Sequence, residues 1–240
     1  MDNASPQSMM EPALSEAAAF VERTLDTLLP QPSGPESRVL EAMRYAALGG
    51  GKRLRGFLVL QSGRVFGVDR RAAGRVAAAI ECVHAYSLVH DDLPAMDNDD
   101  MRRGKPSTHK AFDEATAILA GDALLTLAFG LIASPECHGD PFVRCELVSR
   151  LALAAGHAGM VGGQMMDIAF EGQEPPLPEI TRLQRMKPAA LFMFSCEAGA
   201  IMGKASAPLR TAIATYGQEL GLAFQIADDL LDAEGDPALM

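Results

Sequence analysis

The sequence predicts an all-α protein with a single domain, and three observations support this prediction. Apolar residues recur at helical spacing in most segments, as in the stripe formed by Ala17, Val21, Leu25 and Leu28. No stretch alternates apolar and polar residues as a half-buried strand would, and no internal repeat or domain linker is evident. The chain has 240 residues, of which 48% are hydrophobic, and this is enough to bury one core.

Helical periodicity and breaker residues define the expected elements in order. Residues 1–11 are expected to be disordered, and residues 12–240 to form the helical domain. The first helix is expected over about 12–28, and the second begins near Ser37 and ends at three glycines, 49–51. Further helices are expected over about 57–67, 70–93, 112–134, 142–169, 180–202, 207–220 and 221–233.

Composition excludes several classes of partner. The formal charge of −10 does not favour nucleic acid or an anionic membrane surface as a partner. The four cysteines are scattered, which is typical of core residues in a reducing compartment. No basic-then-apolar segment precedes the first helix, and no apolar run is long enough to span a bilayer. We therefore expect a cytoplasmic protein.

An acidic cluster follows the long apolar helix expected over 70–93. Five aspartates lie within ten residues, and two arginines come directly after them. Carboxylate oxygens suit a hard cation such as Mg2+, and arginine binds diphosphate through paired hydrogen bonds. Pro94 interrupts the helix inside the cluster, and a loop there would let Asp91 and Asp97 reach one ion. A solvated helix end is the alternative interpretation.

A second acidic cluster emerges from an apolar helix near the end of the chain. Asp228, Asp229 and Asp232 are spaced three and four residues apart, so they share one helix face. Carboxylates on one face repel each other unless something neutralises them. Two such clusters in one chain favour a site that holds cations over two independent solvated surfaces.

A basic cluster follows the three glycines. Lys52, Arg53 and Arg55 precede an apolar helix, and glycines, cations and a helix start together form a reasonable anion-binding cradle. The spacing differs from the phosphate loop of nucleotide enzymes. A glycine-capped helix end with surface cations is the alternative.

Two helices carry further polar candidates. His84 and His90 lie on the buried helix, and we interpret His90 as a hydrogen-bonded core residue. Gln164 and Asp167 share a face of the helix expected over 142–169. They form either a buried pair or part of a site wall, and we favour the wall.

These motifs resemble the trans-prenyltransferases, or isoprenyl diphosphate synthases, and most closely the bacterial farnesyl diphosphate synthases. The resemblance runs from about residue 35 to the end and rests on three motifs in the same order: GGGKRLR, HDDLPAMDNDDMRRG and FQIADDLLD. It implies an all-helical bundle around a deep central cavity, usually as a homodimer. The family continues through further C-terminal helices, so we expect those helices to be missing after Met240.

The resemblance also implies residue roles. Mg2+ would be held by the aspartates of both clusters: Asp91, Asp92, Asp97, Asp228, Asp229 and Asp232. Arg102 and Lys187 would grip the allylic diphosphate, and Gln225 would face the reacting carbons. Isopentenyl diphosphate would be bound by Lys52, Arg55, His84 and Arg103. Tyr86, with Ser87, would close the cavity floor one turn below Asp91 and favour a fifteen-carbon product, or else Tyr86 is simple core packing.

The implied reaction condenses isopentenyl diphosphate with dimethylallyl or geranyl diphosphate by ionisation, carbon–carbon bond formation and proton loss. No serine, cysteine or histidine triad is evident, and this chemistry needs no protein nucleophile. Geranyl or geranylgeranyl diphosphate synthesis and a non-catalytic subunit of a heteromeric synthase are alternatives. A terpene cyclase would leave the Lys52–Arg55 cluster without a purpose.

The sequence departs from the family pattern at two further positions. Pro188 follows Lys187 where threonine is common, and it disfavours helical geometry at Lys187. Gly56 stands where proline is usual.

Overall fold

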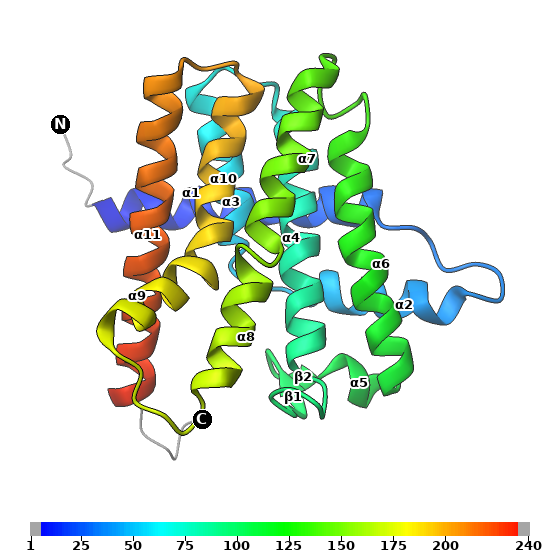
Figure 1. The fold of residues 1–240 in the computed structure, drawn as a ribbon. Helices are drawn as coiled ribbons and strands as arrows, with labels where there is room; N and C mark the ends of the chain where they lie inside the picture. Colours follow the sequence, from blue (N-terminus) through cyan, green and yellow to red (C-terminus); the bar gives the residue numbers. More distant parts are fainter. Residues whose placement is uncertain (1–5, 235–240) are drawn as a thin grey trace.

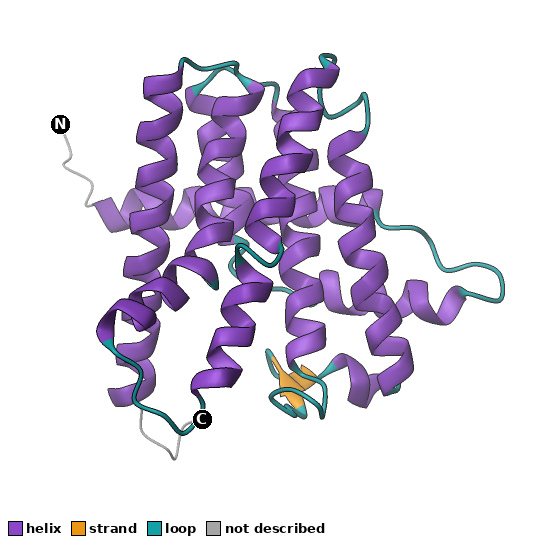
Figure 2. Cartoon of the chain, in the orientation of Figure 1, coloured by secondary structure: helices purple, strands orange, loops and turns teal. Residues whose placement is uncertain are grey.

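The computed structural model describes residues 6–234, and within this range the side chains of residues 6–9, 228, 229 and 231–234 lie outside the description. The described chain is almost entirely helical, which confirms the predicted all-α class (Figure 2). Its strands form one small antiparallel hairpin, in which β1 (Met101–Arg102) pairs with β2 (Lys105–Pro106). This hairpin lies directly after the first acidic cluster and carries two arginines, Arg102 in β1 and Arg103 in the turn.

The centre of the fold is α4 (Arg70–Asp91). Its alanine-rich sequence has buried residues on every side, as expected of a helix surrounded by others. It packs against α3 (Leu54–Val65), α6 (Glu114–Ala133) and α10 (Ala189–Met202). The side chain of Asp69 caps its first turn by accepting two backbone N–H groups at 3.0 and 3.1 Å.

Three shorter or peripheral helices close the bundle around α4. In Figure 1, α1 (Pro6–Leu28) crosses behind the upright helices, and it packs on α3 and α4. Helix α2 (Ser37–Ala47) contacts α4 and α6, and α5 (Thr108–Ala111) contacts α6. Because α1 begins at Pro6, the prediction of disorder is wrong for residues 6–11.

The helix predicted over 142–169 is two helices, α7 (Pro141–Ala155) and α8 (Met160–Phe170). At the junction, Gly156 has an extended backbone and Gly159 is also outside the helical region. Glycine loses the most conformational freedom in a helix, so a pair of glycines favours a break at this point.

The helix predicted over 180–202 is also divided, into α9 (Leu177–Met186) and α10. Pro188 lies at the break because it has no N–H to continue the helical ladder. Lys187 itself keeps helical backbone angles, with φ of −72° and ψ of −63°, so the predicted departure from helical geometry at this residue was wrong, as was the continuous helix.

Conversely, the two helices predicted over 207–220 and 221–233 are one, α11 (Ala207–Glu234). Gly217 and Gly221 lie on the face that meets α10, where an added Cβ would come within 2.8 Å of the Met193 Cα and 2.6 Å of the Ala189 Cα. These glycines therefore permit close helix packing rather than ending the helix.

Candidate active site

The loop after α4 brings two acidic residues together. The Asp97 backbone N–H donates to the Asp91 carbonyl at 2.9 Å, and the Met96 N–H donates to the Leu93 carbonyl, also at 2.9 Å. Asn98 then takes a left-handed backbone conformation, with φ of 55°. The chain thus folds back on itself, so that Asp97 lies beside the end of α4 rather than on a continued helix face.

The Asp91 carboxyl group is electrostatically unusual. Burial raises its pKa to about 6, helped by the negative charges of Asp97 and Asp92 and opposed chiefly by the positive charge of Lys187. Within the described residues, no hydrogen bond or ion pair engages the carboxylates of Asp91 and Asp97. These two acids lack a protein cation of their own, which suits carboxylates that await an external one.

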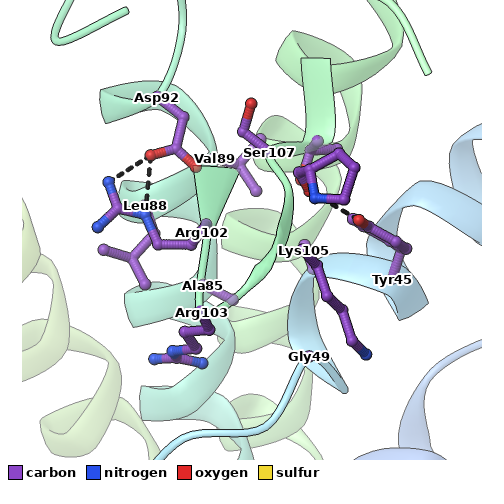
Figure 3. Close-up of a pocket in the computed structure, with 13 residues that line it drawn as sticks. Tyr45, Gly49, Ala85, Leu88, Val89, Asp92, Arg102, Arg103, Lys105 and Ser107 are labelled. Carbon is purple, nitrogen blue, oxygen red and sulfur yellow. Dashed lines mark hydrogen bonds and ion pairs between the residues drawn. The ribbon is translucent and has the colours of Figure 1, made fainter. Parts of the chain in front are cut away.

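Asp92 has a different environment. It is only 2% exposed, and the Arg102 Nε donates to its Oδ1 at 2.9 Å. The same guanidinium contacts Asp99 Oδ2 at 2.9 Å, and Figure 3 shows Arg102 turned toward Asp92. The sequence analysis assigned Asp92 to a metal and Arg102 to a diphosphate. The structure pairs these two residues with each other, and the two assigned roles stay predictions.

Four arginines surround His84. Burial lowers its pKa well below the usual value, and the nearby positive charges of Arg55, Arg103, Arg53 and Arg102 lower it further. His84 is therefore neutral at physiological pH, with one ring nitrogen able to donate. The helix α4, the start of α3 and the hairpin together gather this cationic cluster at one place.

Arg55 and Arg103 are held without full hydrogen bonding. The Arg55 Cζ lies 5.1 Å from the ring centre of Phe192 on α10, and its buried Nε has no partner among the described atoms. Arg103 packs so closely on Gly51 that an added Cβ there would lie 2.7 Å from its Cζ. Lys52 is exposed at the same loop. The absence of a side chain at Gly51 thus lets the Arg103 guanidinium lie against the backbone of this loop, and the anion cradle stays a prediction.

A second wall comes from α8 and α9. The Lys187 Nζ, at the C-terminal end of α9, donates to Asp167 Oδ2 on α8 at 2.5 Å. The backbone of Lys187 reaches this position because Gly163 of α8 has no side chain, and an added Cβ would lie 2.6 Å from the Lys187 N atom. Gln164 is half-buried on the same helix. The positive charge of Lys187 acts on Asp91, which indicates that Lys187 lies near the first acidic cluster.

One turn before Asp91, the aromatic residues of α4 are packed. Tyr86 is 7% exposed, and its ring meets that of His90 edge-on at 5.7 Å. A His90 ring nitrogen lies 3.1 Å from the Ile118 carbonyl, which confirms His90 as a hydrogen-bonded residue. Ser87 donates to the His84 carbonyl at 2.9 Å.

The structure adds residues that the sequence analysis missed. A small pocket of about 40 Å³ lies between α2, α4 and the hairpin (Figure 3). Tyr45 lines it and donates to the Pro106 carbonyl at 2.6 Å. Glu81 is buried beneath the arginines. The sequence could have indicated this residue, because it is the lone acidic residue of α4 before Asp91.

The second acidic cluster lies on α11, which packs against α9 and α10. The side chains of Asp228, Asp229 and Asp232 lie outside the described residues. Gln225 is half-buried on the same helix. Among the side chains that the structure describes, no three His, Cys, Asp or Glu residues form a metal-binding group. The acidic side chains of the second cluster are not among these, so its predicted magnesium ligands stay a prediction.

Both the sequence and the fold of this chain are similar to those of known proteins. Residues 36–240 match the family described as polyprenyl synthetase. The farnesyl diphosphate synthase of Geobacillus stearothermophilus is 46% identical over 230 residues, which cover 95% of this chain and 77% of that protein. The farnesyl diphosphate synthase of Escherichia coli strain K12 is 48% identical over 209 residues, or 84% of this chain and 68% of that protein. The solved structure of an FPP/GFPP synthase from Zymomonas mobilis has a TM-score of 0.90 and 54% identity, covering 93% of this chain and 81% of that chain.

Proposed function

Because this chain belongs to the polyprenyl synthetase family, we propose that it condenses isopentenyl diphosphate with dimethylallyl or geranyl diphosphate. Farnesyl diphosphate is the main product that we propose, since relatives with this activity are more than 40% identical over most of the chain. The observation that carries the proposal is the placement of the Asp91–Asp97 pair beside the arginine cluster around His84, with Lys187 close to Asp91.

We propose Mg2+ as the cofactor. The pair Asp91 and Asp97 fits this ion, because no described side chain forms an ion pair with either carboxylate and Mg2+ commonly uses one or two carboxylates together with phosphate oxygens. Asp228, Asp229 and Asp232 are proposed as further ligands from α11. When bound, Mg2+ neutralises negative charge on the departing diphosphate.

The protein's own residues then have distinct roles. Lys187 would stabilise the allylic diphosphate as its C–O bond breaks, and Arg102, held by Asp92, would bind the same diphosphate with its remaining N–H groups. Arg55, Arg103 and neutral His84 would orient the second diphosphate, with Lys52 at the rim. The double bond of isopentenyl diphosphate attacks the allylic cation and forms the new C–C bond. A proton then leaves the condensed product, and the released diphosphate is a suitable acceptor.

Apolar surroundings would protect the allylic cation from water. Tyr86, which is buried about one turn before Asp91, is proposed to limit the length of the growing chain, with Ser87 beside it. Gln164 and Gln225 are proposed to line the reacting hydrocarbon from α8 and α11. Because Tyr86 also packs in the core, its role in product length requires the separate test described below.

We further propose a homodimer. Large apolar side chains are exposed on α6 and α7, among them Leu119 at 57% and Phe142 at 83%. Helix α6 is long and apolar enough to cross a membrane, but it packs against α2 and α4 as a core helix. A second copy would cover its remaining apolar face. Sedimentation velocity should give twice the monomer mass, and Leu119→Glu should shift the protein to monomer.

A cytoplasmic location is also proposed, in keeping with the free cysteines.

The decisive experiment is turnover by the purified chain. Labelled isopentenyl diphosphate, geranyl diphosphate and Mg2+ should give a fifteen-carbon product, identified by chromatography after removal of the diphosphate. Asp91→Asn provides a control that keeps the shape of the side chain but removes its charge. Absence of product at every Mg2+ concentration, from protein shown to be folded, would reject catalysis and favour a non-catalytic subunit.

A further inference from the structure

The cradle loop contains an arginine that faces the protein interior. Arg53 has a left-handed backbone, with φ of 48°, at the residue before α3. A non-glycine residue in this conformation is strained by about 1 to 3 kcal/mol, and such strain persists only when surrounding contacts hold it. Its side chain is only 3% exposed, whereas Lys52 beside it is exposed. The unusual backbone thus sends Arg53 inward and its neighbour outward.

Interior contacts occupy the Arg53 guanidinium. It donates to Glu22 of α1 at 2.6 and 3.0 Å, to the Ala47 carbonyl at the end of α2 at 2.5 Å, and to Glu81 of α4 at 3.4 Å. This one side chain therefore connects three helices to the start of α3. Because its donors are used in this way, it contributes to the site by holding the loop in place.

Glu81 completes this arrangement from below. It is 2% exposed, and its Oε1 accepts the Gly56 backbone N–H at 2.9 Å while its Oε2 faces Arg53. Gly56 lies in the first turn of α3, where an N–H has no helical partner of its own. Proline at this position would remove the donor, so the contact needs a residue that keeps its backbone N–H, as Gly56 does.

The same carboxylate lies under the cationic cluster. Glu81 precedes His84 by three residues on α4, so both occupy one face of the helix. Its negative charge favours the charged forms of Arg55 and Arg103, which otherwise repel each other. Glu81 therefore has a role in geometry, through Arg53 and Gly56, and a role in charge, through the cluster.

We propose that Glu81 is a positioning residue for diphosphate binding: through Arg53 and Gly56, it fixes the first turn of α3 and thereby the position of Arg55, which lies in that turn. The inference rests on the proposed function, in which this cluster binds isopentenyl diphosphate. Glu81 touches neither substrate, and it acts through the loop.

The test compares anion binding by the wild-type chain and by Glu81→Gln. Calorimetric titration with inorganic diphosphate in EDTA measures the arginine cluster without a contribution from metal. Removing a negative charge beside arginines would by itself strengthen anion binding. Misplacement of the loop weakens it, and we expect the Kd to rise about tenfold, because displacement by about 1 Å can cost up to about 100-fold. Weaker binding therefore identifies the geometric role.

Glu197→Gln is the matched control, since Glu197 is also buried and contacts two arginines, Arg150 and Arg210, outside the cluster. The Kd of this variant should stay within about twofold of the wild-type value, even if its thermal stability falls as much as that of Glu81→Gln. If Glu81→Gln does not fold, Glu22→Gln weakens the other carboxylate contact of Arg53, from a more exposed side, and should raise the Kd about threefold if Arg53 holds the loop in place. Unchanged or tighter binding in the folded variant would overturn the proposal.

Turnover separates this inference from the proposed function. If the wild-type chain forms no prenyl product, the proposed function fails, while the comparison of Kd values still judges Glu81. If the wild-type chain is active, Glu81→Gln should raise the KM for isopentenyl diphosphate more than it lowers kcat. A lower Tm with an unchanged KM would show a purely structural residue and would reject the positioning role.

Discussion

The guanidinium of Arg102 binds the buried carboxylate of Asp92, with 2.9 Å between Nε and Oδ1. We expect Asp92→Asn to lower the free energy of unfolding by about 1 to 3 kcal/mol, because it removes one partner of a largely buried, charge-assisted hydrogen bond. Activity should fall as well, since Arg102 loses its anchor, but the Mg2+ concentration for half-maximal rate should change little. Urea unfolding and a Mg2+ titration of the rate measure the two effects.

Asp91→Asn provides the contrast for this experiment. No described residue forms an ion pair with the Asp91 carboxylate, so removing its charge should not break a protein contact. We expect the Mg2+ requirement to rise instead, by at least about tenfold. A large shift in Mg2+ requirement for Asp92→Asn, equal to that for Asp91→Asn, would show that Asp92 binds the metal directly.

The raised pKa of Asp91 predicts a pH-dependent effect on stability. In the folded chain its pKa is about 6, against an ordinary value of 3.8. Between these values the folded state holds the proton that the unfolded state releases, so stability falls as pH rises through this window and stays lower above it. In EDTA, Asp91→Asn should therefore raise the Tm at pH 7.5 and have little effect at pH 4. Thermal unfolding at both pH values measures this difference.

Asp113→Asn is the control of opposite sign. The backbone N–H of Thr116, then Arg38 and the Thr116 hydroxyl, lower the Asp113 pKa to about 2. This carboxylate stabilises the fold above its ordinary pKa, and the contribution is lost as pH falls toward 2. Its replacement should lower the Tm at pH 7.5. If Asp91→Asn also lowers the Tm at pH 7.5, the burial of Asp91 does not destabilise the metal-free fold.

Much of the fold was predictable because apolar periodicity specifies which helices are buried. The start of α4 followed from its apolar run, and the helix ends at Asp91, near the predicted limit at residue 93. The glycines were the exception. Gly156 and Gly159 break a helix, whereas Gly217 and Gly221 remain inside one because α10 lies against them. The sequence alone does not show which glycines meet a neighbouring helix, so the predicted boundaries were wrong there.

The candidate site was predictable to a similar extent. Motif order identified the acidic loop and the basic loop, and the structure brings Arg55, His84 and Arg103 together. The sequence did not show that Arg53 turns inward, because the sign of φ at one loop residue depends on contacts with α1, α2 and α4. Nor did it show that Arg102 pairs with Asp92. Both features depend on which of several nearby opposite charges lie close enough to pair.

Tyr86→Ala tests the proposed limit on product length. Tyr86 is buried against His90 one turn before Asp91, so its removal should open space below the acidic cluster. We expect longer products, of twenty or more carbons, at a stability cost of about 3 to 5 kcal/mol for the loss of a buried aromatic ring. Chromatography of the dephosphorylated products measures chain length. Phe192→Leu changes another buried aromatic, on α10, and should leave chain length unaltered. A fifteen-carbon product from Tyr86→Ala would assign Tyr86 to core packing alone.

The contact between Gly163 and Lys187 predicts that a single added methyl group impairs catalysis. An alanine Cβ at Gly163 would lie 2.6 Å from the Lys187 N atom and 2.9 Å from its Cα, and backbone atoms of this kind cannot rotate away. Lys187 would therefore be displaced from Asp167 and from Asp91. We expect kcat to fall by about 10- to 100-fold, as reported for small displacements of catalytic groups in general. Gly130→Ala is the matched control, since nothing lies within 4 Å of that position on α6 and alanine favours the helix. It should keep full activity and slightly raise the Tm. Wild-type kcat in Gly163→Ala would mean that α8 and α9 separate freely and that the position of Lys187 does not depend on their close approach.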